Sequence, residues 1–94
     1  ALDMAEARGM GEGFMGLGDN KVPFVGHGIG LAVDGWPPLA TGFERPLEAG
    51  MVLALEPKQG IPGVGMPGVE NTFEVTEDGG VCLTGDDYDI VCVD

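Results

Sequence analysis

Short apolar runs separated by glycine and proline limit most strongly what this chain can fold into. Its 94 residues include 18 glycines and 7 prolines, residue types that interrupt helices and favour turns. The clearest run is residues 51–55, Met-Val-Leu-Ala-Leu, which follows Gly50 and stops at Glu56 and Pro57. An unbroken apolar run with turn signals at both ends is typical of a buried strand. The sequence therefore predicts a sheet with residues 51–55 as a central strand.

A second strand is predicted by alternation over residues 69–77. Apolar and polar side chains would point to opposite faces of a sheet, because successive residues of a strand alternate in direction. Asp78-Gly79-Gly80 then predicts a hairpin turn into a strand over residues 81–84, which gives a mainly antiparallel meander. One face would carry Val69, Phe73 and Val75, and the other Glu70, Thr72, Glu74 and Thr76.

The remaining segments predict little helix. Residues 2–8 are typical of the last turns of a helix that begins upstream and stops at Gly9, and residues 9–18 of an irregular packed connection. Trp36-Pro37-Pro38 predicts an extended turn after the glycine-rich segment 24–33. Residues 59–68 predict a loop, and residues 90–93 a last short strand or an extended tail. We expect one small domain at most.

Charge and composition exclude several classes of partner. Sixteen acidic against four basic residues give a formal net charge of −12, which repels nucleic acids and anionic membranes. No apolar stretch approaches the roughly 20 residues of a membrane span, and the first residues do not have the pattern of a signal peptide. Cys82 and Cys92 are expected to be reduced thiols, with a disulfide between them as the lesser alternative. We expect a cytoplasmic protein.

The only histidine and one glutamate are the first candidates for chemistry. His27 lies between glycines, so a metal or ligand can approach its imidazole freely, although such a residue can also serve only as a partner for the backbone. Glu56 continues the apolar strand 51–55 and is expected to be partly buried, where an unpaired charge is costly. It therefore needs a cation, unless Pro57 has turned it into solvent or toward Lys58 or Arg45.

Glu70 completes the candidate set. Its face of the alternating strand either meets solvent or lines a wet cleft, and periodicity cannot decide between the two. Glu70 taken on its own is expected to face solvent. However, His27, Glu56 and Glu70 each stand where a predicted strand meets a glycine or proline turn. One imidazole and two carboxylates are suitable donors for a divalent metal. We therefore expect the three side chains to converge on one cleft.

Three segments in the same order resemble a known family. Residues 26–31 (Gly-His-Gly-Ile-Gly-Leu), 47–57 and 68–79 are similar to the C-terminal part of the pita-bread metallopeptidases, and the resemblance runs from about residue 10 to residue 85. The family contains Xaa-Pro dipeptidases, Xaa-Pro aminopeptidases, methionine aminopeptidases and creatine amidinohydrolase. The resemblance implies an α+β fold with a curved, mainly antiparallel sheet and little helix. Residues 1–94 would be the C-terminal half of a catalytic domain whose N-terminal half is missing.

The same resemblance implies a site. Family members hold two divalent metals through two aspartates, a histidine and two glutamates, so His27, Glu56 and Glu70 would be metal ligands, with Glu70 bridging. His27 and Glu56 would also be catalytic. Both aspartates would come from the missing half. Two positions depart from the family pattern: Asp34 stands where many members have a substrate-contacting histidine, and Gly68 where others have an arginine.

The implied function is hydrolysis of a peptide or dipeptide at an Xaa-Pro bond, with two manganese, cobalt or zinc ions. The full-length enzyme would be a homodimer, with Asp34 binding substrate, and the isolated chain would be inactive. Two alternatives stay open. One is a non-catalytic pita-bread protein that binds a peptide or a partner, and the other is a creatine amidinohydrolase-like enzyme.

Overall fold

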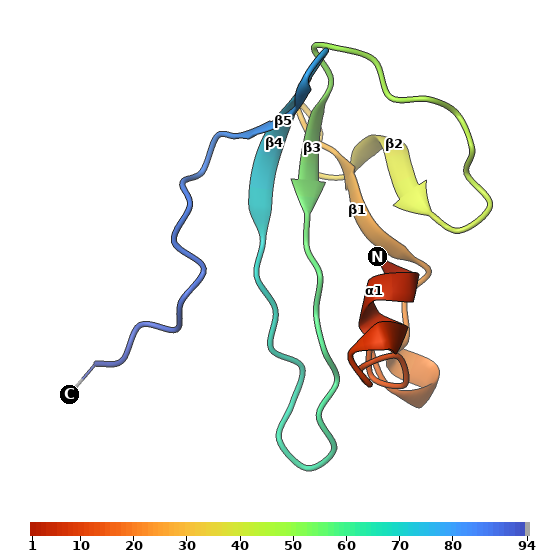
Figure 1. Cartoon of the computed structure of the whole chain (residues 1–94), viewed down its shortest axis with the longest axis vertical. Helices are drawn as coiled ribbons and strands as arrows, with labels where there is room; N and C mark the ends of the chain where they lie inside the picture. Colours follow the sequence, from red (N-terminus) through yellow and green to blue (C-terminus); the bar gives the residue numbers. More distant parts are fainter. Residues whose placement is uncertain (94) are drawn as a thin grey trace.

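The computed structural model describes residues 1–93 as a single five-stranded sheet with one short helix (Figure 1). All strand pairs are antiparallel, and the strand order is β2-β1-β3-β4-β5. The predicted sheet with little helix is therefore confirmed. The strands are β1 (Phe24–Gly28), β2 (Gly35–Ala40), β3 (Val52–Leu55), β4 (Asn71–Thr76) and β5 (Gly79–Cys82), preceded by α1 (Leu2–Ala7) and the 3-10 turn η1 (Gly18–Asn20).

β3 is the central strand, as its sequence predicts. It pairs with β1 on one side, where His27 is opposite Ala54, and with β4 on the other, where Asn71 is opposite Leu55. Leu53 and Ala54 are buried on its two faces. A strand that has neighbours on both sides and apolar residues on both faces satisfies its backbone polar groups and removes apolar surface from water together.

β2 corrects the predicted turn at Trp36-Pro37-Pro38. These residues lie inside a strand, and Pro38 is the partner of His27 in β1. Proline is tolerated here because β2 is at the edge of the sheet and needs a hydrogen-bonded neighbour on one side only. The pairing is accordingly irregular, with a register shift between His27 and Gly28.

The β4–β5 turn begins one residue earlier and ends two residues earlier than predicted. Thr76 pairs with Gly79, which leaves Glu77 and Asp78 as the turn and places Gly79 and Gly80 in β5. The Thr76 hydroxyl donates a hydrogen bond to the Gly79 carbonyl at 2.7 Å. This bond closes a two-residue connection, one of the common hairpin lengths.

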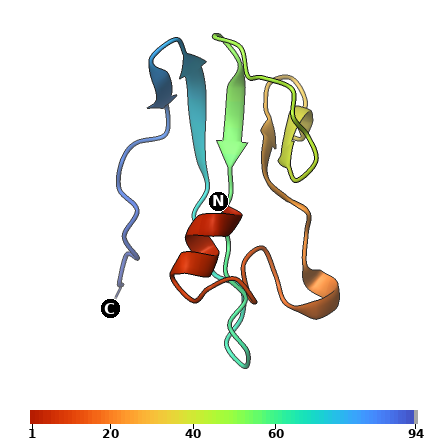
Figure 2. The same cartoon turned by 45° about the vertical axis from the view of Figure 1, so that its right-hand side comes forward.

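The N-terminal segment packs irregularly beside the sheet, as predicted. α1 ends before Gly9, whose φ of 70° suits a helix stop. Met15 is only 3% exposed, and its backbone joins two distant segments: its amide donates to the Lys58 carbonyl, and its carbonyl accepts from Val22. In Figure 2 this segment runs beside the lower ends of the central strands.

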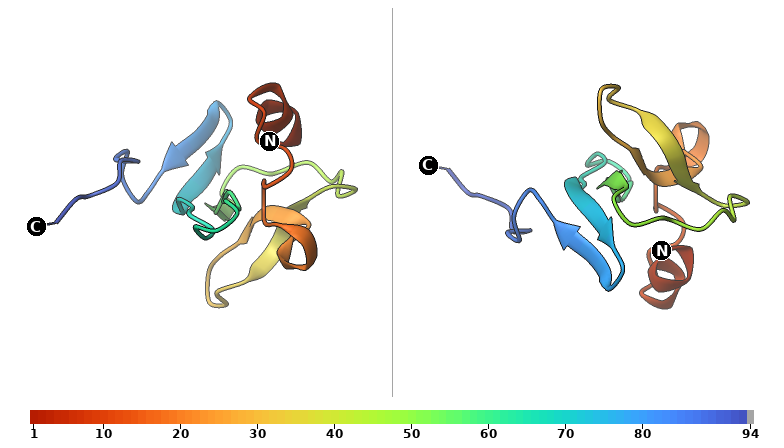
Figure 3. Two further views of the ribbon diagram at one scale, coloured as in Figure 1. Left: turned by 90° about the horizontal axis from the view of Figure 1, so that it is seen from below. Right: turned by 90° about the horizontal axis from the view of Figure 1, so that it is seen from above.

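The C-terminal segment leaves the sheet. In both end-on views of Figure 3 it runs away from β5, and residues 90–93 form an extended tail rather than a strand. Cys82, half-buried in β5, and the exposed Cys92 are both free thiols. No helix among residues 1–93 is long and apolar enough to cross a membrane.

Close packing of β1 on β3 predicts a selective effect of alanine at Gly26. A Cβ there would overlap the Ala54 carbonyl oxygen and crowd the Leu55 side chain, so Gly26→Ala should lower the free energy of unfolding by about 1–3 kcal/mol. Gly30→Ala is the control, because a Cβ at Gly30 meets nothing within 4 Å. Urea unfolding followed by circular dichroism measures both, and equal stabilities would contradict the described β1–β3 pairing.

Candidate metal centre

The three candidate ligands come from neighbouring strands. His27 lies in β1, Glu56 follows the last residue of β3, and Glu70 precedes the first residue of β4. His27 is opposite Ala54, so it shares a face with Glu56 two residues further on, and the pairing of Leu55 with Asn71 brings Glu70 opposite Glu56. Strand register alone therefore places all three on one face of the sheet.

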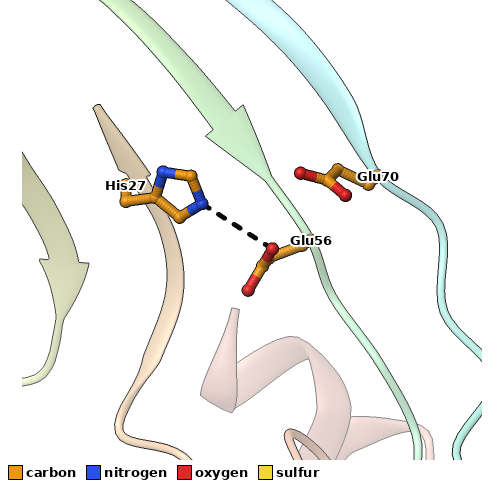
Figure 4. Close-up of side chains that lie close together, drawn as sticks. All are labelled: His27, Glu56 and Glu70. Atoms are coloured by element: carbon orange, nitrogen blue, oxygen red, sulfur yellow. Dashed lines mark ion pairs between the residues drawn. The ribbon is translucent and has the colours of Figure 1, made fainter. Parts of the chain in front are cut away.

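Their side chains converge. One ligand atom from each of His27, Glu56 and Glu70 can be chosen so that all three lie within 4.8 Å of one another (Figure 4). The predicted convergence is confirmed, and Glu70 takes part in the cluster while it remains exposed to solvent. Ligands of two ions about 3.5–4 Å apart are separated by such distances.

The histidine is fixed by its own backbone neighbour. His27 is 7% exposed, and its Nδ1 lies 2.9 Å from the Gly28 carbonyl oxygen. In the neutral imidazole this contact requires Nδ1–H to donate, which leaves the lone pair on Nε2. Nε2 in turn lies 3.7 Å from Oε2 of Glu56. A backbone carbonyl that sets tautomer and ring orientation is a frequent companion of a metal-binding histidine.

Glu56 is partly buried and also lies near Lys58, two environments that the sequence predicts as alternatives. Its side chain is 24% exposed, with Oε2 toward His27 and Oε1 3.9 Å from Nζ of Lys58. The predicted partial burial of Glu56 is therefore confirmed, and so is Lys58, one of the two cations predicted as its alternative partners. Arg45, the other, instead lies over the Trp36 ring with 5.8 Å between its Cζ atom and the ring centroid.

Asp34 lies beside the same histidine. Its Oδ1 is 3.2 Å from Nε2 of His27, although its side chain is 82% exposed. The sequence predicts a substrate-binding role for Asp34 but not this contact. The contact depends on the β1–β2 pairing, in which Gly35 is opposite Gly28 and returns the chain to His27.

Electrostatics favour a cation at this site. The hydrogen bond to the Gly28 carbonyl is the largest influence that raises the pKa of His27 above its ordinary 6.5, burial opposes it, and the negative charges of Asp34, Glu56 and Glu70 raise it further. The imidazole therefore attracts a proton, first because the Gly28 carbonyl accepts its hydrogen bond and then because carboxylates surround it. A divalent ion would compete with that proton for the same nitrogen.

The donor set is suitable for a divalent metal. An imidazole nitrogen and two carboxylates are common ligands of zinc, cobalt and manganese. The structure is thus an antiparallel-sheet protein whose candidate metal centre consists of one histidine and two glutamates.

Comparison with known proteins identifies the family. The sequence pattern of metallopeptidase family M24 matches residues 1–77, and the chain belongs to this family. It is 39% identical over 69 residues to an Xaa-Pro dipeptidase of Pyrococcus furiosus, covering 73% of this chain and 20% of that protein. It is 35% identical over 76 residues to the putative dipeptidase YkvY of Bacillus subtilis, covering 81% of this chain and 21% of that protein.

The solved structures that resemble this chain are the same kinds of peptidase as its sequence relatives. An X-Pro aminopeptidase from Thermotoga maritima matches with a TM-score of 0.84 and 27% identity, over 98% of this chain and 24% of that chain. An Xaa-Pro dipeptidase from Bacillus anthracis matches with a TM-score of 0.80 and 32% identity, over 96% and 23%. The described sheet is thus part of a pita-bread fold. The chain spans about a fifth of the length of the curated relatives it matches.

The environment of His27 predicts a direction of titration. In the metal-free chain its pKa should lie above 6.5 and should fall in Asp34→Asn, because a neighbouring negative charge is removed. Since the folded pKa is raised, protonated His27 stabilises the fold below pH 6.5, and this stabilisation is lost as the pH rises through the folded value. Titration of the His27 ring proton by NMR, with the urea-unfolded chain as control, checks both. A folded pKa at or below the unfolded one would contradict the described cluster.

Proposed function

We propose that residues 1–94 form the C-terminal half of the catalytic domain of a dinuclear metal-dependent peptidase that hydrolyses Xaa-Pro bonds of peptides or dipeptides. The observation that carries this proposal is the convergence of His27, Glu56 and Glu70 on one face of the sheet. Membership of a metallopeptidase family and relatives named as Xaa-Pro dipeptidases support the reaction and the substrate class.

In this proposal the chain supplies three metal ligands. His27 would hold a metal ion through Nε2, and Glu56 and Glu70 would do so through their carboxylates. Two aspartates from the rest of the catalytic domain complete the set. Manganese, cobalt and zinc all accept such donors. A cytoplasmic location, which the two free thiols favour, and a homodimeric complete enzyme also belong to the proposal.

The chain's own residues have distinct roles in the reaction. Two bound divalent ions supply Lewis acidity and lower the pKa of a water molecule. Glu56 would act as a proton acceptor, because its carboxylate lies among the proposed ligands and is only partly exposed. His27 keeps its ring orientation through the Gly28 carbonyl. Asp34, at the exposed side of His27, contacts the substrate.

One observation favours a second candidate function, in which the protein binds a peptide or partner without catalysis. The carboxylate of Asp34 lies 3.2 Å from the His27 nitrogen that we propose as a metal ligand. A protonated histidine would be satisfied by that contact without a metal. Metal content separates the two candidates, since only the enzyme depends on bound manganese, cobalt or zinc.

Replacement of Glu56 by glutamine tests the proposed chemistry in the complete enzyme. Glu56→Gln keeps the side-chain volume but removes a ligand charge and a proton acceptor, so turnover should fall by about 10²–10⁴-fold or more. The thermal midpoint should change little. Glu74→Gln, at an exposed position of β4, is the matched control and should keep its activity. Near wild-type turnover in Glu56→Gln would contradict metal-dependent hydrolysis through this residue.

The incomplete ligand set predicts that the isolated 94-residue chain is inactive. Three ligands hold two ions too loosely for catalysis, because metal-assisted hydrolysis depends on fixed geometry. The measurement is release of proline from an Xaa-Pro dipeptide by the pure chain with added manganese or cobalt. Hydrolysis that copurifies with the chain and disappears in Glu56→Gln would show that these residues suffice alone.

A further inference from the structure

Lys58 is the cation that contacts the candidate metal centre. Its Nζ lies 3.9 Å from Oε1 of Glu56, and the two side chains are 30% and 24% exposed. The ammonium of Lys21, by contrast, donates to backbone carbonyls of the N-terminal connection, and Arg45 lies over Trp36. The sequence suggests Lys58 only as one alternative partner for Glu56.

The backbone of Lys58 is held from two sides. Residues 57–59 run antiparallel to residues 67–69, with hydrogen bonds from the Gln59 amide to the Pro67 carbonyl at 2.9 Å and from the Val69 amide to the Pro57 carbonyl at 3.2 Å. On the other side the Lys58 carbonyl accepts from Met15 at 2.8 Å. The backbone position from which the Lys58 side chain extends toward Glu56 is therefore fixed.

Gly68 makes this arrangement sterically possible. It is the bridge partner of Lys58, and a Cβ at Gly68 would lie 2.9 Å from both Cβ of Lys58 and the carbonyl oxygen of Pro57. Contacts this short force the backbone to shift. The φ of Gly68 is not in the left-handed region, so glycine is needed here for space and not for conformation.

The two carboxylate oxygens of Glu56 face different partners. Oε2 faces His27 at 3.7 Å, and Oε1 faces the ammonium of Lys58 at 3.9 Å. The distance to Lys58 is too long for a hydrogen bond, so the ammonium acts by electrostatic attraction. Partial burial of both groups reduces the screening that weakens fully exposed pairs.

We propose that Lys58 is a positioning residue that presents Oε2 of Glu56 to the metal centre, and that Gly68 provides the room it needs. The proposal rests on the function proposed above, in which Glu56 is a metal ligand. Other family members carry an arginine at the position of Gly68, as the resemblance implies. In this chain the positive charge comes instead from Lys58, on the segment that faces Gly68. Partners that orient metal ligands in this way typically change metal affinity 10–100-fold when they are removed.

The orientation of Glu56 is measured directly in the metal-free complete enzyme by NMR scalar couplings about its χ1 bond. We expect one rotamer in the wild type, averaging in Lys58→Met, and restoration in Lys58→Arg. Gly68→Ala should also cause averaging, although it leaves both charges in place. The matched control is Gly80→Ala, because a Cβ at Gly80 meets only Phe73 at 3.7 Å or more. An unchanged single rotamer in Lys58→Met and Gly68→Ala overturns the proposal.

Metal affinity separates positioning from simple charge. Loss of a cation beside a metal site should tighten binding if Lys58 acts only through its charge, whereas loss of a positioning group should weaken it. In the complete enzyme we therefore expect Lys58→Met to weaken Mn²⁺ binding about 10-fold, read from paramagnetic broadening of the His27 ring signal, with Lys21→Met as the charge control. Tighter or equal binding overturns the positioning role. If the wild-type complete enzyme shows no broadening, the ligand set of the proposed function fails, and the couplings of Glu56 still decide the role of Lys58.

Discussion

The pairing register of β3 is the constraint on which the rest of the structure depends. β3 lies between β1 and β4, and His27, Glu56 and Glu70 share a face only because Ala54 is opposite His27 and Leu55 is opposite Asn71. A slip of one residue would turn the side chains of β3 to the other face. The buried Leu53 and Ala54 oppose such a slip, so the apolar core and the candidate metal centre are specified by the same pairing.

Local patterns were sufficient for what depends on neighbours in the sequence. The apolar run at residues 51–55 predicts β3, and alternation predicts β4, because burial and face are periodic properties of a strand. Two errors have local causes. Trp36-Pro37-Pro38 has the composition of a turn, and only its place at the sheet edge makes it a strand. The β4–β5 turn begins and ends earlier than predicted, because consecutive glycines fit both a turn and a strand that begins after it.

The candidate site also has a part that local sequence predicts and a part that depends on long-range pairing. His27, Glu56 and Glu70 can be chosen from the sequence because each is a metal-binding residue type at the end of a predicted strand. The contact of Asp34 with His27 and that of Lys58 with Glu56 are different. The first needs the irregular β1–β2 pairing, and the second needs the facing of Lys58 and Gly68 across an unpredicted bridge. Long-range pairings of this kind leave no periodic signal in a single sequence.

The charges around His27 connect stability with function. Without a metal, Asp34, Glu56 and Glu70 repel one another, and the imidazole and Lys58 are the groups that offset them. The same arrangement would bind divalent ions, because a cation relieves the repulsion and takes the nitrogen that a proton otherwise occupies. Binding to the folded state alone would also stabilise it by mass action. Carboxylates gathered on one sheet face thus cost stability in the metal-free chain, and a cost of this kind is expected where a residue set serves a site and not the core.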